Sequence, residues 1–568
     1  MIAAKHQNSS RERDCPASRT LPGLLLVWLT LGSAAAQDIE PQIEAYEAYQ
    51  GRPTLHMRNR GRDKLAQTRD PRALEILAKS YRVVGSPADQ ERYELASIAT
   101  RWCEDEAHLT VYDRWRKRHD QPEDAWLWFR ALHVNLAQHG PEELLEIVAG
   151  REDVFLRATA LEVFAQGAPQ DALRAVGVAL DSLPRSGHGR SLMLESAMSV
   201  LTTWPAEALG PALQAPEFQA RARALIALLD ERRTEARTQL VFRRRLARFF
   251  DVDTLDADSA TWLSRLESAG PETRPETRPE TRAQTASSAA QLGRTRTRPR
   301  TEFFGVRATG DRIAYVIDLS DSMMKPLTSK ERGDLPLSGG GPKDEQRNRA
   351  RLAWDRIETR FDAAREYLAL SISTLEPDQS FCVIAFGTRA EPLRATPGLV
   401  PASQRNIDRV LAELASIQPG APSTQLPDGT LRGRTNLHGG LHRAFKLREK
   451  GLVETQEYVD PKTLDEGCDT IFLLSDGAPN HCDWTAGDTR DPEDGRGYYE
   501  SGVPAPDAPV KSFVAYYRYP EMFDEVRRLN LFRKVELHCI GIGEPDSKML
   551  RGIAGLGGGQ YRFIGTGK

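Results

Sequence analysis

The sequence has few of the features that would assign a protein to a functional class directly. Only six of its 568 residues are cysteines, and their spacing fits no zinc-binding pattern. The formal net charge is −3, so the overall charge gives no reason to expect nucleic acid or an anionic membrane as a partner. The sequence has no H-E-x-x-H, G-x-S-x-G or Walker A motif. We therefore expect a protein that is not an enzyme.

Long apolar runs are also scarce, and the one clear example lies near the N-terminus. Residues 21–31 are apolar, follow several basic residues, and precede the small residues that end at Ala36. This order predicts a signal peptide over residues 1–36, and therefore a secreted or extracytoplasmic protein of the periplasm or cell envelope. An uncleaved membrane anchor is the alternative, although the apolar run is short for a bilayer span.

Five cysteines lie beyond the predicted cleavage point. Cys382 and Cys539 lie inside apolar segments, which predicts small buried side chains rather than metal ligands. Cys468 and Cys482 could pair in an oxidising compartment, but a straight strand between them would hold them too far apart for a disulfide.

The rest of the chain is too long for one hydrophobic core, so we expect a multidomain protein. Residues 37–265 are predicted to be all-α. Segments such as 156–167, 171–183 and 219–231 carry apolar residues at helical spacing and are separated by Gly or Pro turns. Their loose similarity indicates HEAT-like helical repeats, with a concave face for a protein, or else an irregular helical bundle.

The composition changes abruptly after this helical region. Three tandem Pro-Glu-Thr-Arg repeats begin at Pro271, and an arginine-rich tract follows them. Such a segment has almost no apolar side chains to offset the entropy cost of ordering. We therefore predict a disordered linker, rich in Pro, Thr and Arg, over residues 266–303.

Residues 304–568 alternate between short apolar runs and amphipathic segments. The apolar runs predict parallel strands that are covered on both faces, and helices are expected over 354–375 and 407–417. The pattern predicts an α/β domain with a doubly wound, mostly parallel sheet. The predicted strands are 313–317, 381–386, 470–474 and 535–542.

Oxygen-bearing side chains gather where two of these strands end. Asp318, Ser320 and Ser322 follow the first strand at alternate positions, Asp476 follows the third, and Thr435 precedes a helix. Ligands of open parallel sheets bind beyond the carboxyl ends of the strands. Carboxylates and hydroxyls without imidazole or thiolate suit Mg²⁺, Mn²⁺ or Ca²⁺, so we expect a site for one of these cations.

These motifs resemble those of a known family. Asp318, Ser320 and Ser322 in D-x-S-x-S, Thr435 in G-x-T-N-L, and Asp476 in L-L-S-D-G are similar to the metal-ion-dependent adhesion site of von Willebrand factor A domains. The resemblance covers residues 304–568. It implies a Rossmann-like, six-stranded, mostly parallel sheet with Asp318 and Asp476 on neighbouring central strands. It also implies that the three hydroxyls coordinate the metal, that both carboxylates bind it directly or through water, and that a partner's carboxylate completes the shell.

The sequence also departs from the family pattern. Arg434 stands where a common form has glycine, and we expect it at the rim of the site, pointing to solvent. Two insertions, 325–346 and 481–520, are predicted to emerge on the metal face, where long loops tend to be functional. The second is rich in acids and aromatics. It forms a partner-reading rim, or supplies an acid to the open metal position, or is a mobile acidic lid without a dedicated role. We expect His438 and His481 to be ordinary loop or helix-start residues rather than metal ligands.

The sequence therefore predicts an exported, non-enzymatic binding or adhesion protein. Its metal site would bind an exposed carboxylate on a protein or cell-envelope partner, and the helical region would add a scaffold. Two alternatives stay open. A helical-repeat region followed by this domain is similar to the Ro-type RNA-binding proteins, although the export signal and balanced charge speak against RNA. A metal-dependent hydrolase would use an acid of the second insertion as its base.

Overall fold

The computed structural model places most of both predicted domains. The predicted signal peptide, most of the predicted linker and nearly all of the insertion 481–520 lie outside the described residues. Within the part that is described, no helix is both long and apolar enough to cross a membrane. The structure describes residues 39–52, 55–83, 89–101, 106–204, 213, 215–252, 257–268, 301–336, 352–417, 434–453, 458–481 and 519–565.

The described part of the N-terminal region is helical, as predicted. Pro71 opens a helix after Asp70, whose carboxylate accepts a hydrogen bond from the Arg72 N–H at 2.8 Å, so the expected start signal operates there. The helices are α1 (Glu40–Gln50), α2 (Leu55–Ala66), α3 (Pro71–Val83), α4 (Asp89–Arg101), α5 (Glu106–Lys117), α6 (Ala125–His139), α7 (Glu142–Ala149), α8 (Val154–Val163), α9 (Pro169–Asp181), α10 (His188–Thr202), α12 (Pro216–Ala227), α13 (Ala236–Phe249) and α14 (Ser259–Ser268).

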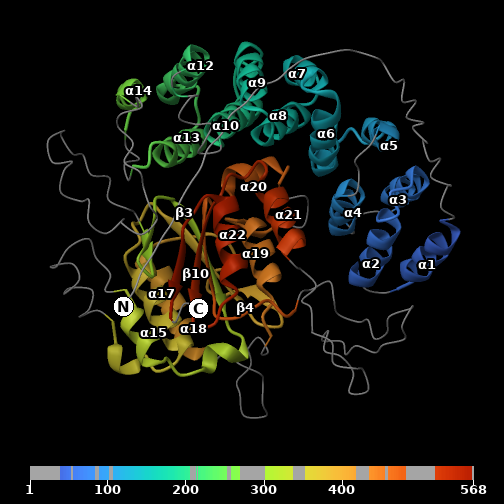
Figure 1. The fold of residues 1–568 in the computed structure, drawn as a ribbon. Helices are drawn as coiled ribbons and strands as arrows, with labels where there is room; N and C mark the ends of the chain where they lie inside the picture. Colours follow the sequence, from blue (N-terminus) through green and yellow to red (C-terminus); the bar gives the residue numbers. More distant parts are fainter. Residues whose placement is uncertain are drawn as a thin grey trace, which may run out of the picture.

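These helices form a curved arc, which we call the helical arc, around the C-terminal half (Figure 1). One row packs in the order α2, α4, α6, α8, α10 and α13, each helix against the next. The other helices form a second row, in which α7, α9, α12 and α14 pack in succession. Each helix packs mainly against its neighbours in the rows, so the arrangement is elongated. Its inner, concave side faces the C-terminal half (Figure 1).

The C-terminal half is built on a mostly parallel sheet, which confirms the predicted fold class. The strand order is β11-β10-β9-β3-β4-β5, and a seventh short strand, β6, also pairs with β4. Strands β5 and β6 run antiparallel to β4, whereas the other neighbours are parallel. The strands are β3 (Arg312–Asp318), β4 (Ser380–Phe386), β5 (Ala390–Pro392), β6 (Val400–Pro401), β9 (Thr470–Ser475), β10 (Glu536–Ile542) and β11 (Tyr561–Ile564).

Helices cover both faces of this sheet, and the two faces of β3 show how. Tyr315 packs in a core with α17 (Arg360–Ser373) and α18 (Gln404–Ser416). Its neighbour Val316 points to the other face and packs in a core with α19 (Leu437–Phe445), α21 (Tyr519–Asn530) and α22 (Ser547–Gly557). A strand that is buried on both sides needs a continuous apolar run, which is what the sequence shows.

Two details of this half bear on the sequence predictions. The helix expected over 354–375 begins only at Arg360, because Thr359 and Asp362 form a capping box there and Trp354–Arg356 form a separate short turn. Cys382 and Cys539 are buried free thiols, as predicted. Cys468 is also a buried free thiol, and Cys482 lies outside the described residues.

The helical arc meets the sheet at the edge where the strands begin. The Arg244 guanidinium of α13 donates to the backbone oxygen of Asp469, the residue before β9, at 2.8 Å. The Lys534 ammonium, just before β10, donates to Glu162 of α8 at 2.6 Å. Because parallel strands all start at one edge, these contacts hold the arc opposite the carboxyl ends of the strands.

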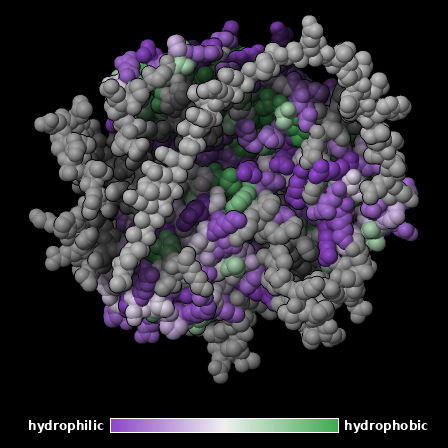
Figure 2. Space-filling view, viewed as in Figure 1, coloured by the Kyte–Doolittle hydropathy of each residue, from purple (hydrophilic) through white to green (hydrophobic). Residues whose placement is uncertain are grey.

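Apolar and aromatic contacts extend this interface. Tyr458, Leu464 and Phe532 of the C-terminal half belong to the hydrophobic core of the helical arc. The Arg528 guanidinium lies 4.0 Å from the ring centroid of Tyr93 in α4 and 5.2 Å from that of Tyr458. Figure 2 shows that the hydrophobic side chains visible from this side lie largely in the hollow between the arc and the C-terminal half. The hydrophobic core of the helical arc therefore extends into the C-terminal half, beside the two cores on the faces of the sheet.

Candidate metal site

The predicted acidic residues lie side by side at the carboxyl edge of the sheet. Asp318 is the last residue of β3, and Asp476 directly follows β9. These strands are hydrogen-bonded neighbours, with Ile317 opposite Leu474. Both carboxylates are buried, with Asp318 0% and Asp476 1% exposed. The expectation that they occupy neighbouring central strands is confirmed.

The predicted hydroxyl residues converge on the same point. The Ser320 and Ser322 hydroxyl oxygens lie 3.0 Å apart, and the Ser322 hydroxyl donates to Asp476 Oδ1 at 2.6 Å. Thr435 reaches this cluster from the loop before α19. A Cβ atom on Gly477 would stand 3.5 Å from Ser322 Oγ and 3.9 Å from Thr435 Oγ1. Gly477 therefore lies between Ser322 and Thr435, at ordinary van der Waals distance from both hydroxyls.

Thr435 is held in place by its loop. Its backbone N–H donates to the side-chain oxygen of Asn480 at 2.8 Å. The next residue, Asn436, caps α19 by accepting a hydrogen bond from the Gly439 N–H at 2.9 Å. The cap and the Asn480 contact fix the loop that carries the Thr435 hydroxyl, because both tie it to ordered backbone.

Asp318 is held by one donor from its own loop and one from β9. Its Oδ1 accepts from the Ser320 N–H at 2.8 Å, and its Oδ2 accepts from the Ser475 hydroxyl at 2.7 Å. Burial raises the pKa of Asp318, and the charge of Asp476 raises it further, although these hydrogen bonds oppose the change. Two buried carboxylates so close together favour a neighbouring positive charge.

A buried arginine supplies part of that charge, and the sequence reasoning missed it. Arg360, only 5% exposed, donates to Asp476 Oδ2 at 2.9 Å and to Glu331 Oε1 of α15 (Ser329–Asp334) at 3.0 Å. The signal that could have found it is the Thr359–Asp362 capping box, which places Arg360 at the first turn of α17. Asp476 thus has one oxygen toward Arg360 and the other toward Ser322.

The chemistry of this donor set fits a hard divalent cation. Adjacent oxygen ligands around an octahedral Mg²⁺ at about 2.1 Å are about 3.0 Å apart. The separation of 3.0 Å between the Ser320 and Ser322 hydroxyls, and that of 2.6 Å between Ser322 and Asp476, are of this order. Within the described ranges, no three His, Cys, Asp or Glu side chains gather in a way that could hold a metal ion. A metal site here would therefore depend on hydroxyl ligands.

The rim of the site carries charged and apolar side chains. Met324, in the short turn Asp321–Met324 after β3, is 49% exposed and is the one exposed large apolar side chain among the described residues. Asp321 is exposed and Arg434 is half-buried. Burial lowers the pKa of Arg434, and the charge of Asp321 opposes this, so the two charges lie within reach of each other. The rim thus combines an apolar contact with both signs of charge.

The two histidines near the site differ in what the structure shows. His438 is buried in α19, and its Nε2 lies 3.4 Å from Glu525 Oε1 of α21, so it takes part in helix packing as expected. Arg528 also pairs with Glu525, at 2.8 Å. Burial raises the pKa of Glu525, but the charges of Arg528 and the hydrogen bond from His438 outweigh it and hold that pKa well below its usual range. His481 is half-buried at the end of a described segment.

Comparison with known proteins agrees with this fold. No curated protein matches the sequence. Residues 355–482 and 517–563 match the family model described as von Willebrand factor type A domain. The matched ranges include Thr435 and Asp476, whereas Asp318, Ser320 and Ser322 precede them. With its mostly parallel central sheet, the C-terminal half of the chain therefore contains a von Willebrand factor type A domain.

Proposed function

We propose that this protein is an exported, non-enzymatic binding protein whose von Willebrand factor type A domain holds a divalent cation. The ligands would be the convergent oxygen cluster of Asp318, Ser320, Ser322, Thr435 and Asp476, and the cation Mg²⁺ or else Mn²⁺ or Ca²⁺. The observation that carries the proposal is that the loops after β3 and β9, far apart in sequence, bring the Ser320 and Ser322 hydroxyls to within 3.0 Å of each other and Ser322 to within 2.6 Å of Asp476. The Thr435 hydroxyl lies on the other side of Gly477.

Each residue of the cluster has a distinct task in this proposal. Asp318 and Asp476 provide negative charge at the bottom of the site, and Ser475 keeps the Asp318 carboxylate from rotating. Ser322 is half-buried, so the cluster is reached from solvent on its side. The cation, when bound, supplies a Lewis acid to which an exposed carboxylate of a partner can bind.

The surroundings of the site support a protein partner. Domains of this family commonly mediate protein–protein binding, and Met324 adds an exposed apolar contact beside the oxygen cluster. The helical arc, which we interpret as HEAT-like, contacts the opposite edge of the sheet through Arg244 and Lys534. The arc would then act as a scaffold that leaves the metal edge available to a partner in the cell envelope.

The metal site can be tested by calorimetry on the full chain, because the two halves share a core. Titration with Mg²⁺ and Mn²⁺ should show one site in the wild type and no measurable binding in Asp318→Ala. Asp321→Ala is the matched control, because it removes an exposed carboxylate three residues away from the same loop. Unchanged affinity in Asp318→Ala, with near-UV circular dichroism showing a native fold, would refute the ligand assignment.

The partner can be sought by capture from a cell-envelope extract, with and without EDTA, followed by mass spectrometry. We expect proteins that are retained by the wild type with a divalent ion and are lost on chelation and in Asp318→Ala. Retention of RNA that falls with salt would instead favour the RNA-binding alternative. Turnover of a substrate that depends on the divalent ion would favour the hydrolase.

A further inference from the structure

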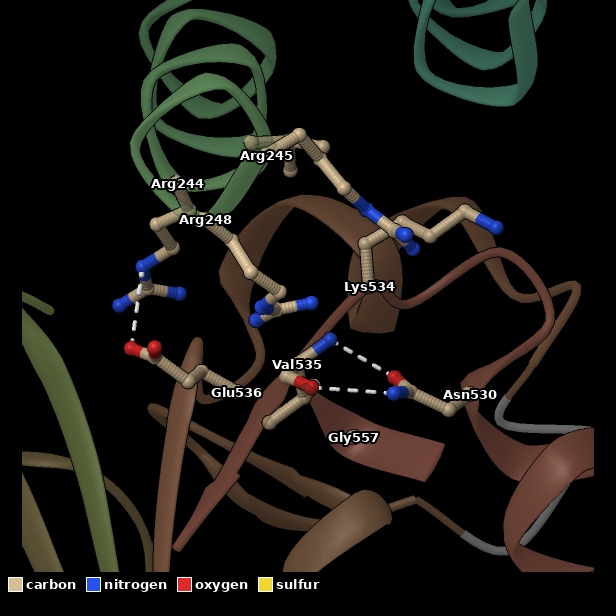
Figure 3. A pocket seen from close by; sticks show the side chains of 9 residues that line it. Arg244, Arg245, Arg248, Asn530, Lys534, Val535, Glu536 and Gly557 are labelled. Carbon is tan, nitrogen blue, oxygen red and sulfur yellow. Dashed lines mark hydrogen bonds and ion pairs between the residues drawn. The ribbon is translucent and has the colours of Figure 1, made fainter. Parts of the chain in front are cut away.

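A basic pocket lies where α13 of the helical arc meets the C-terminal half (Figure 3). It is a small hollow of about 20 Å³ that opens to solvent on one side. It sits beside Glu536, the first residue of β10, and so at the sheet edge opposite the proposed metal site. Four of its lining side chains are cationic: Arg244, Arg245, Arg248 and Lys534. We call this feature the interdomain pocket.

Two of the four cations are neutralised by carboxylates. Arg244 lies 3.4 Å from Glu536, the one acidic residue that lines the pocket. Glu536 is also 3.4 Å from His538, so its charge is directed at two basic groups already. Lys534 pairs with Glu162 at 2.6 Å. The other two lining cations are Arg245 and Arg248.

Arg245 and Arg248 have no carboxylate within ion-pair distance in the described part of the chain. Arg245 donates to the Thr203 hydroxyl at 3.4 Å, and Arg248 donates to the backbone oxygen of Gly558. Burial lowers the pKa of Arg245 to about 10, and the charge of Arg248 adds to the effect. The lining of the pocket therefore carries more positive than negative charge, with Arg245 half-buried and Arg248 exposed, and a bound anion would reduce the repulsion between these two arginines.

The remaining polar wall of the pocket is already satisfied. The Asn530 side-chain oxygen accepts from the Val535 N–H at 2.7 Å, and its NH₂ group donates to the Val535 oxygen at 3.0 Å (Figure 3). The Asn530 amide therefore forms part of the pocket wall, with both of its polar atoms already hydrogen-bonded. The groups left to bind a ligand are the guanidinium donors of Arg245 and Arg248 and those N–H groups of the Lys534 ammonium that do not face Glu162, and such donors favour a small oxyanion.

We propose that the interdomain pocket binds a phosphate group, as inorganic phosphate or as a small phosphomonoester, between Arg245 and Arg248 of α13 and Lys534 of the C-terminal half. Guanidinium groups present paired donors that match phosphate oxygens, and the ammonium adds a point charge. Because the donors come from both halves of the chain, the bound anion links the helical arc to the von Willebrand factor type A domain. This inference does not depend on the metal site.

The probe for the test is inorganic phosphate, added to the full chain in EDTA so that divalent ions play no part. Calorimetry should show saturable binding of one phosphate per chain. The thermal unfolding midpoint should rise with the logarithm of phosphate concentration once the site is saturated, while sodium chloride of equal ionic strength has a smaller effect. A phosphate response no larger than that of chloride overturns the proposal.

Variants locate the site. Arg245→Gln/Arg248→Gln should weaken phosphate binding at least tenfold. Arg243→Gln, on the same helix but outside the pocket, should bind as the wild type does and controls for the loss of charge. Arg248→Gln alone, at an exposed side chain, serves if the double variant does not fold, and should also weaken binding. Wild-type affinity in the variants would place the phosphate elsewhere and refute the proposal.

A second titration distinguishes the two sources of the phosphate group. Glycerol phosphate that binds more tightly than inorganic phosphate would show that the open side of the pocket contacts the organic part of a phosphomonoester. Equal or weaker binding of the ester would assign the pocket to free phosphate. Either result supports the phosphate site. If neither compound binds, the proposal is refuted.

Discussion

Neutralising Glu536 should weaken the junction between the two halves of the protein by a calculable amount. This carboxylate lies 3.4 Å from the Arg244 guanidinium of the helical arc, and the two side chains are only 17% and 7% exposed. Burial tends to raise the pKa of Glu536, but the charges of Arg244, His538 and Arg248 outweigh it and lower the pKa from 4.5 to about 2. The folded protein therefore favours the ionised form strongly.

The magnitude follows from linkage. The difference between 4.5 and about 2 corresponds to about 3 kcal/mol of stability at neutral pH, at about 1.4 kcal/mol for each pH unit. Because the folded-state pKa is the lower one, this contribution is present above about pH 4.5 and is lost as the pH falls toward 2. At pH 3 about 1.4 kcal/mol should remain.

The assay is urea unfolding of Glu536→Gln and wild type, followed by tryptophan fluorescence between pH 7 and pH 3. The variant should be less stable by about 3 kcal/mol at pH 7, and the gap should narrow as the pH falls. Glu142→Gln is the matched control, because Glu142 also lies 3.4 Å from an arginine, but those side chains are 68% and 50% exposed. It should change stability by less than about 1 kcal/mol. Equal effects of the two variants, or a gap that does not depend on pH, would refute the reasoning.

Three further changes test other parts of the structure. Arg360→Gln removes the positive charge beside Asp476, so we expect Mg²⁺ to bind about tenfold more tightly in calorimetry, and weaker binding would contradict the charge argument. Gly558→Ala should lower the free energy of unfolding by about 1 kcal/mol or more, because Gly558 has φ +65° and a Cβ there would meet the Arg248 guanidinium. An unchanged unfolding midpoint would disprove this. Met324→Ser should leave stability and Mg²⁺ affinity unchanged but reduce partner capture, and full capture would remove Met324 from the binding face.

The strands and the oxygen cluster could be predicted because their signals are local. Each apolar run marks a strand that is buried on both faces, and in a parallel sheet the residues that follow such runs must meet at one edge. That geometry placed Asp318 and Asp476 at one edge, and the resemblance to von Willebrand factor A domains added that their strands are neighbours, as the structure shows. The start of α17 was misplaced because apolar spacing continues back to Trp354, whereas the capping box at Thr359 sets the true start.

The contacts between the halves could not be predicted in this way. Arg244 and Glu536 are nearly three hundred residues apart, and each taken alone resembles a solvated surface charge. Their pairing depends on how the helical arc curves, which follows from many small packing angles rather than from a motif. For the same reason, the interdomain pocket has no signature in the sequence, since its cations come from α13 and from the segment before β10.

The attachment of the helical arc to the strand-start edge has a consequence for how this protein can change. β3 and β9 end at the far edge from Arg244 and Lys534, so loops that start there can be lengthened, shortened or exchanged without disturbing that attachment. Grafting a different loop after Asp476 should therefore redirect recognition while the framework stays intact. Sequence changes in related proteins of this architecture should therefore concentrate in the loops at the carboxyl ends of the strands, while the residues at the strand-start edge change little.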